Sequence, residues 1–125
     1  MLNTCTLIGR LGAKPEVKYT TAGHAVVTVN IAVDRELSKE RRDAGEEKQT
    51  DWIPVVAWRY LAEWLAQYMD KGCMICVCGR LQVRQYVAEG GSNRRAFEVV
   101  ADSIKAITWP GDKPDRAPHP AEVES

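Results

Sequence analysis

The chain has 125 residues, of which 45% are hydrophobic and 27% are charged. This composition is typical of a globular domain and excludes a wholly disordered chain, and the length suits a single domain that needs neither disulfides nor metal. Its 17 basic residues balance 17 acidic ones, so affinity for a polyanion would have to come from the local distribution of charge.

Targeting and membrane segments are not expected. Residues 1–5 lack the basic start of a secretory signal, and no window approaches the roughly 18 apolar residues of a membrane helix. We therefore expect a cytoplasmic protein whose four cysteines are reduced thiols.

Apolar periodicity predicts strands in the N-terminal half. A first strand is expected over residues 4–11. In residues 25–34 every second residue is Val or Ile, so one face belongs to the core and the other can meet solvent or a ligand. Residues 35–50 are almost wholly polar and predict a flexible hairpin loop. The next strand covers residues 51–58, and Pro54 cannot donate a ladder hydrogen bond, so an edge or a bulge is expected there.

The C-terminal half predicts one helix and two long strands. Apolar residues recur at helical spacing in residues 59–71, and Gly72 suits the C-terminus of that helix. The strands follow at about residues 72–86 and 94–108. Residues 110–125 contain four prolines and no apolar periodicity, which predicts a disordered, mildly acidic tail.

The expected order is strand, strand, strand, helix, strand, strand. Five strands with one helix between the third and fourth, in a domain spanning residues 1–109, are what an all-β OB-fold barrel requires. The helix would plug one end of the barrel. A hairpin-rich sandwich is the alternative, although it offers no role for the single helix.

Three cysteines form a C-x2-C-x-C pattern at Cys73, Cys76 and Cys78. A structural zinc site usually has four ligands, and the one other cysteine is Cys5. On a strand, Cys76 and Cys78 share a face while Cys73 lies on the other. We therefore expect no metal and no cofactor, and interpret the cysteines as small buried hydrophobes.

Arginines and a tyrosine gather where the last two strands leave the expected core. Arg80, Arg84 and Tyr86 end one strand, and Arg94 and Arg95 begin the next. Cations beside aromatic rings, with no catalytic group among them, are typical of a surface that holds a flexible polyanion.

Trp52 and Trp58 are separated by an even number of residues, so an unbroken strand places both on one face. Val56 shares that face, whereas Ile53 and Val55 lie on the other. Both faces are apolar, so the pattern leaves open whether the indole rings are buried in the core or exposed to a ligand.

No catalytic signature is present. His24 and His119 have neither a carboxylate nor a nucleophile at a motif spacing. We expect a protein that is not an enzyme.

Several short motifs follow one another along the chain. They are Leu7-Ile-Gly-Arg-Leu11, Pro15-Glu-Val-Lys-Tyr19-Thr20, Gly23, Ile31-Ala-Val33, Trp52 with Val55-Val-Ala-Trp58, Lys71-Gly72, Gly79-Arg-Leu-Gln-Val-Arg84 and Glu98-Val-Val-Ala-Asp102. In this order and at these spacings the chain resembles the bacterial single-stranded DNA-binding proteins (SSB) over about residues 2–107.

The resemblance implies an OB-fold subunit of a homotetramer that wraps single-stranded DNA without strong sequence preference and protects it during replication, repair and recombination, in the cytoplasm at the nucleoid. Two subunits would pair partly through their N-terminal strands. By position, bases would stack on Trp52, Trp58 and Tyr86. Leu37 falls where some members carry a further stacking tryptophan, so binding should be weaker at that corner. The expected phosphate contacts are Arg10, Lys18, Lys71, Arg80, Arg84, Arg94 and Arg95.

The end of the chain departs from the family pattern. Many members close on an acidic stretch and Pro-Phe that docks replication and repair enzymes, whereas residues 120–125 read Pro-Ala-Glu-Val-Glu-Ser. The resemblance therefore supports recruitment of such partners only weakly. This departure favours a rival hypothesis, an OB-fold module that binds mainly protein. An RNA-binding OB protein is disfavoured because nothing resembles the aromatic motifs of cold-shock domains.

Overall fold

The computed structural model describes residues 1–111 of the chain. The predicted tail at residues 110–125 lies outside them apart from its first two residues, as do His119 and the C-terminal residues considered for partner recruitment. The described elements are β1 (Cys5–Leu11), β2 (Lys18–Tyr19), β3 (Ala25–Asp34), α1 (Lys39–Asp43), β4 (Thr50–Trp58), α2 (Tyr60–Tyr68), β5 (Met74–Val87) and β6 (Asn93–Ala106).

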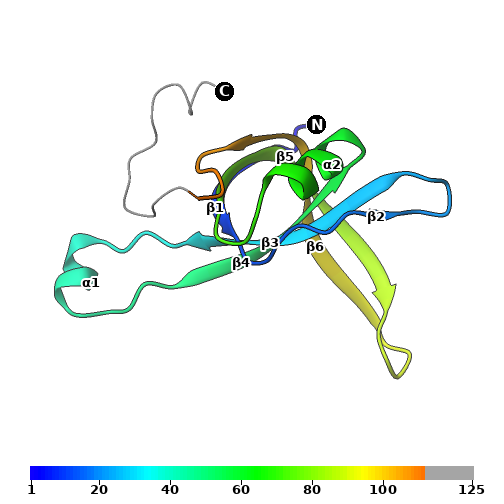
Figure 1. The fold of residues 1–125 in the computed structure, drawn as a ribbon. Helices are drawn as coiled ribbons and strands as arrows, with labels where there is room; N and C mark the ends of the chain where they lie inside the picture. Colours follow the sequence, from blue (N-terminus) through cyan, green and yellow to red (C-terminus); the bar gives the residue numbers. More distant parts are fainter. Residues whose placement is uncertain (112–125) are drawn as a thin grey trace.

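The strands form one sheet that closes on itself. The strand order is β1-β5-β6-β4-β3-β2, and β1 also pairs with β3. Every pairing is antiparallel except that of β4 with β6. Figure 1 shows α2 beside the closed strands, with the β3–β4 and β5–β6 hairpins projecting in different directions. The structure confirms the predicted OB-like fold, to which the two-residue strand β2 is an addition.

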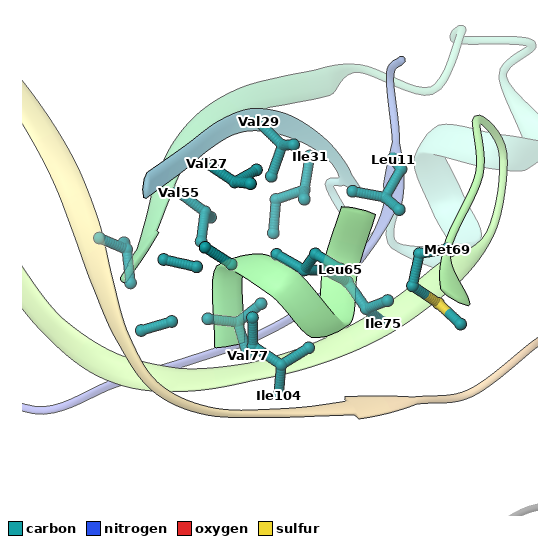
Figure 2. Packing of buried hydrophobic residues seen from close by; sticks show 14 of the residues in the cluster. Leu11, Val27, Val29, Ile31, Val55, Leu65, Met69, Ile75, Val77 and Ile104 are labelled. Carbon is teal, nitrogen blue, oxygen red and sulfur yellow. The ribbon is translucent and has the colours of Figure 1, made fainter. Parts of the chain in front are cut away.

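Aliphatic side chains from the strands and from α2 fill the barrel (Figure 2). Val27 and Ile31 of β3 belong to one cluster with Val55 of β4 and Leu65 of α2. Each of these four residues is at most 1% exposed. The alternation in β3 therefore predicted the core face correctly.

Helix α2 is shorter than predicted, because it ends at Tyr68. Met69 is already extended, and its side chain is buried in the core. Gly72 has a φ of 87° and its N–H donates to the carbonyl of Leu11 at 2.8 Å. Gly72 thus belongs to the turn between α2 and β5, which is hydrogen-bonded to the end of β1, and is not the C-terminus of the helix.

Residues 35–50 are not simply a loop, because the five-residue helix α1 lies within them. The hydroxyl of Ser38 accepts a hydrogen bond from the N–H of Arg41 at 3.2 Å and so caps the first turn. Arg41 also pairs with Glu46. This helix was not predicted, because α1 has no buried residue and hence no apolar stripe.

Pro54 lies in β4 with its nitrogen directed away from β3. The hydrogen bonds of Arg35 N to Gln49 O and of Arg59 N to Ala25 O place Asn30 and Pro54 at a non-hydrogen-bonded pair. On the other side of β4, only Val55 and Val56 pair with β6. The prediction of an unpaired edge at Pro54 is therefore confirmed.

Gly79 marks the point where the β5–β6 hairpin leaves the barrel. The register shifts there, because Cys78 pairs with Ser103 whereas Gly79 pairs with Ala101. A Cβ atom on Gly79 would lie 2.0 Å from the carbonyl oxygen of Val100. Only glycine permits this close approach of the two strands.

The cysteines occupy the predicted faces, but Cys73 alone of the four is the small buried hydrophobe that we expected, because Cys5, Cys76 and Cys78 are half-buried. Cys73 is buried in the core, whereas Cys76 and Cys78 are half-buried on the opposite side of β5. Burial, with a smaller effect of the neighbouring Cys78, raises the pKa of the Cys76 thiol. Within residues 1–111 no three His, Cys, Asp or Glu side chains gather as a metal site would require. Nor does any helix in this part of the chain have the length and apolarity to cross a membrane.

We predict that Leu65→Ala lowers the free energy of unfolding by about 2–5 kcal/mol, because it leaves a cavity at a fully buried position. Gln67→Ala, at an exposed position on the same helix, should change it by less than about 0.5 kcal/mol. Urea unfolding of both variants measures the difference. Equal losses would contradict the placement of α2 over the core.

Candidate nucleic-acid interface

The two tryptophans of β4 point away from the core. Trp52 is 60% exposed and Trp58 is 42% exposed, whereas Val55 and Ala57 on the other face of the strand are fully buried. The structure therefore decides the question that the sequence left open, because the inner face of β4 is occupied by the smaller residues.

Trp52 and Trp58 lie on what we call the outer face, the side of the sheet, from β1 and β2 through β3, β4 and β6 to β5, that is turned away from the core. Register places a cation in line with each ring. Lys18 pairs with Val26, which pairs with Trp58. Arg10 pairs with Ala32 of β3, which pairs with Trp52. Two predicted phosphate contacts thus lie across the sheet from the two rings.

The outer face continues onto the β5–β6 hairpin. Val56 of β4 pairs with Val100 of β6, which pairs with Arg80 of β5. Alternation along β5 is unbroken, so every second residue after Arg80 shares its face, and Arg94 lies opposite Tyr86. The hairpin therefore adds Arg80, Arg84, Tyr86 and Arg94 to the outer face.

Strand pairing does not place two other predicted phosphate contacts, Arg95 and Lys71, on the outer face. Arg95 pairs with Gln85, on the opposite side of the hairpin, with Val83 and Phe97. Lys71 lies in the turn after α2, where its N–H donates to the side chain of Asp70 at 2.7 Å. The roles of Arg95 and Lys71 stay predictions.

The cations of the outer face differ in how far their charge is balanced. The guanidinium of Arg84 lies 3.8 Å from the carboxylate of Glu98, and that of Arg80 lies 3.7 Å from Asp102. Among the residues that the structure describes, Arg10, Lys18 and Arg94 form no ion pair. Three positive charges on this face are therefore not balanced by a neighbouring acid.

Glu98 is a residue of this face to which the sequence analysis gave no role. It is 7% exposed, and its carboxylate accepts a hydrogen bond from the amide of Gln82 at 3.4 Å. It lies directly opposite Gln82 in the β5–β6 register. If the register of β5 with β6 had been assigned from the sequence, it would have placed Glu98 beside Arg84.

Gly12 is a second missed residue, and it determines the position of an aromatic ring. A Cβ atom on Gly12 would lie 2.7 Å from the six-membered ring of Trp52. The indole therefore rests directly against the backbone of Gly12. Nearby, Lys14, Glu16 and Lys18 line a hollow of about 330 Å³ with Thr28 of β3. Lys14 is therefore a further cation at this edge, accompanied by one acid.

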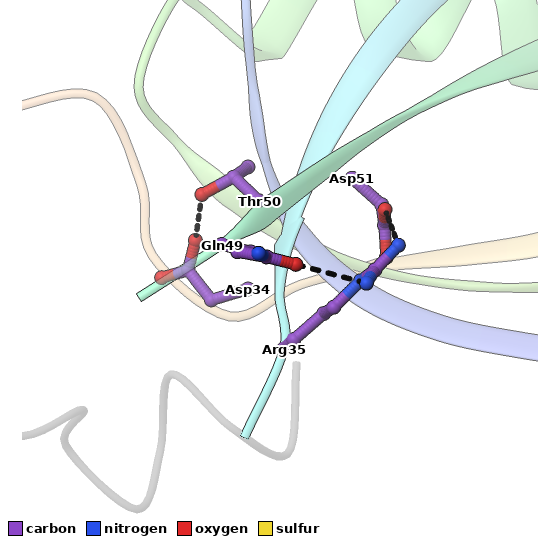
Figure 3. Close-up of polar contacts among 5 residues, drawn as sticks. All are labelled: Asp34, Arg35, Gln49, Thr50 and Asp51. Atoms are coloured by element: carbon purple, nitrogen blue, oxygen red, sulfur yellow. Dashed lines mark hydrogen bonds and ion pairs between the residues drawn. The ribbon is translucent and has the colours of Figure 1, made fainter. Parts of the chain in front are cut away.

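The root of the β3–β4 hairpin is held by polar contacts (Figure 3). Arg35 donates to both carboxylate oxygens of Asp51 at 3.0 Å and to the side-chain oxygen of Gln49 at 2.9 Å. Thr50 donates to Asp34 at 2.7 Å. The hydrogen bond from Arg35 lowers the pKa of Asp51, so these contacts persist to lower pH than an isolated aspartate would allow.

Leu37 lies farther along this hairpin and is partly buried. It lines a hollow of about 350 Å³ together with the acids Asp34 and Glu36 and the cations Arg35, Arg42 and Lys48. This corner therefore has mixed charge and an aliphatic side chain at the position where some family members were expected to carry a stacking tryptophan.

The remaining two tryptophans lie in a separate cluster. Trp64 is half-buried and packs against the core, and its ring centroid is 6.1 Å from that of Trp109. Tyr68 contacts both rings. The fluorescence of Trp64 and Trp109 should therefore respond to unfolding of the domain, whereas that of Trp52 and Trp58 should respond to contacts on the outer face.

Comparison with known proteins gives one family. The model described as "Single-strand binding protein family" matches residues 2–107. The chain is 45% identical over 109 residues to the single-stranded DNA-binding protein of Clostridium tetani, which covers 86% of this chain and 72% of that protein. It is 39% identical over 105 residues to single-stranded DNA-binding protein B of Bacillus subtilis, covering 84% and 89% of the two chains.

We predict that Gly12→Ala displaces the Trp52 ring and shifts the tryptophan emission, because the added methyl group and the indole cannot share the same space. The same substitution in a Trp52→Phe background should leave the emission unchanged. A shift that persists in that background would show that Gly12 acts on another ring.

Proposed function

The chain belongs to the single-strand binding protein family, and on that premise we propose that its outer face binds single-stranded DNA by base stacking and phosphate neutralisation. Members of this family bind DNA and are not enzymes. The observation that carries the proposal is that Trp52, Trp58 and Tyr86 are all exposed on one continuous face.

Stacking explains binding without strong sequence preference. Every base has a π-face, and base–aromatic stacking contributes roughly 1–3 kcal/mol per base. The rings on the outer face are 42–60% exposed, so each keeps an accessible surface while its edge is held by the sheet. Duplex DNA keeps its bases stacked on one another and cannot use such a surface.

Phosphate neutralisation supplies the remaining affinity. Arg10, Lys18 and Arg94 are cations of the outer face that form no ion pair within residues 1–111. Arg10 and Lys18 lie across the sheet from the two indole rings, and Arg94 lies opposite Tyr86. Arg80 joins them because its pair with Asp102 is exposed, and exposed pairs at such distances contribute little. Each phosphate contact releases a counterion, so binding weakens as salt is added.

The biological role that follows is protection of single strands during replication, repair and recombination, in the cytoplasm with the DNA. Residues 1–109 would form the binding domain. Stacking and cation contacts hold bases and phosphates of any sequence, which suits a protein that coats whatever strand is exposed.

The chain also presents a surface suited to self-association. Residues 5–8 of β1 pair with β5 alone, which leaves the other edge of this segment open. Ile8 is 52% exposed on the same segment, beside Cys76. We propose that copies of the chain assemble through β1 into the homotetramer that the resemblance implies.

For DNA binding, we predict that oligo-dT strongly quenches tryptophan fluorescence, that duplex DNA does not, and that the affinity falls with salt. Trp52→Ala, Trp58→Ala and Tyr86→Ala should each weaken binding about tenfold. Trp52→Phe/Trp58→Phe retains the domain tryptophans and should lose most of the quenching. Unchanged affinity in all three alanine variants would refute the stacking assignment.

For assembly, we predict that Ile8→Asp reduces the molecular mass in sedimentation equilibrium, because a charge cannot be buried in an apolar contact without a partner. Glu36→Asp, at an exposed position on the distant β3–β4 hairpin, is the matched control and should leave the mass unchanged. A wild-type protein that sediments as a monomer would contradict the tetramer.

A further inference from the structure

Arg84 is held between a ring and a buried acid on the outer face. Its guanidinium carbon lies 5.6 Å from the centroid of the Tyr86 ring, and its Nε lies 3.8 Å from Oε2 of Glu98. Directly across the strands from Arg84 is Ala96, whose small side chain leaves room for the guanidinium to lie along the sheet. Arg84 therefore has its own cation–π partner and its own counter-charge.

The counter-charge is unlike that of the neighbouring arginine. The side chain of Glu98 is 9% exposed, whereas that of Asp102, the partner of Arg80, is 67% exposed. A carboxylate removed from water is stabilised mainly by its cation, so separating it from Arg84 is costly. The exposed pair of Arg80 and Asp102 separates readily when a phosphate arrives.

The guanidinium group is planar and delocalised, and it stacks on aromatic rings as well as pairing with anions. Bases stack on arginine planes as they do on tryptophan and tyrosine. The charge of Arg84 is balanced through its Nε, and the side chain as a whole is 59% exposed, so the guanidinium plane remains accessible to a base.

We propose that Tyr86, Arg84 and Glu98 form a nucleobase subsite in which Arg84 offers its plane to a base and contributes little to phosphate neutralisation. Tyr86 supports the guanidinium from below, and Glu98 is a positioning residue that fixes its orientation. This inference rests on the proposed function, and it gives Arg84 a role different from the phosphate contact expected from the sequence.

The test separates stacking from charge through the salt dependence of binding. The probe is dT of about 10 nucleotides, which is within the range of one OB-fold site. For single strands, the slope of log K against log salt changes by about 0.7 for each phosphate contact. Arg94→Ala, which removes an arginine without an acidic neighbour, should therefore make the slope shallower by about 0.7.

Arg84→Ala should instead weaken binding about tenfold at every salt concentration and leave the slope unchanged. Arg84→Lys keeps the charge and loses the plane, so its affinity should lie closer to that of Arg84→Ala than to that of the wild-type protein. A slope that falls as it does in Arg94→Ala, or full recovery in Arg84→Lys, would overturn the proposal.

Glu98→Gln provides the reciprocal measurement, because it keeps the shape of the side chain and frees the charge of Arg84. The slope should become steeper by about 0.7. In Glu98→Gln/Arg84→Ala it should return to the wild-type value. A steeper slope that persists in the double variant would show that the effect belongs to Glu98 alone and would overturn the role of Arg84.

Different experimental results would refute the proposed function and this further inference. If the wild-type protein does not bind dT at all, single-strand binding itself is refuted. If it binds, and the Trp52→Ala variant loses affinity while Arg84→Ala follows Arg94→Ala, only the nucleobase subsite is refuted. Thermal unfolding by circular dichroism confirms that each variant is folded.

Discussion

Burial of the inner face of β4 is the constraint on which the binding surface depends. Val55 and Ala57 are fully buried between β3 and the rest of the core, and alternation then directs Trp52 and Trp58 outward. A shift of one residue in this register would bury both indoles and expose the aliphatic side chains. The same strand also joins β3 to β6, so its register carries the outer face onto the hairpin that bears Tyr86.

Charge on the outer face is organised locally, although the chain as a whole has no net charge. Some cations of this face form an ion pair with an acid and others do not, so two arginines of the same strand can play different roles in binding. Arg80 and Arg84 are four residues apart on β5, yet one meets an exposed carboxylate and the other a nearly buried one. Counting basic residues would not reveal this difference, because it arises from burial.

The sequence predicted the strands well because apolar alternation is a strong signal where one face is buried. It could not decide the faces of Trp52 and Trp58, since both faces of that segment are apolar. It missed α1, which has only a capping serine to indicate it, and it extended α2 past Tyr68 because Met69 continues the apolar spacing. Which of Arg94 and Arg95 lies on the outer face, and the pairing of Glu98 with Arg84, depend on cross-strand register, which no local pattern contains.

The pairing of β1 with β5 has a consequence for the synthesis of the protein. Cys5 pairs with Gly79, so the first strand of the barrel has no partner along most of its length until more than half of the chain has left the ribosome. At about 5–20 residues per second, that interval lasts roughly 4–15 seconds. Contacts between residues so distant in sequence also slow folding. The barrel therefore closes late, and the nascent chain carries a first strand that is unpaired along most of its length until β5 has been made.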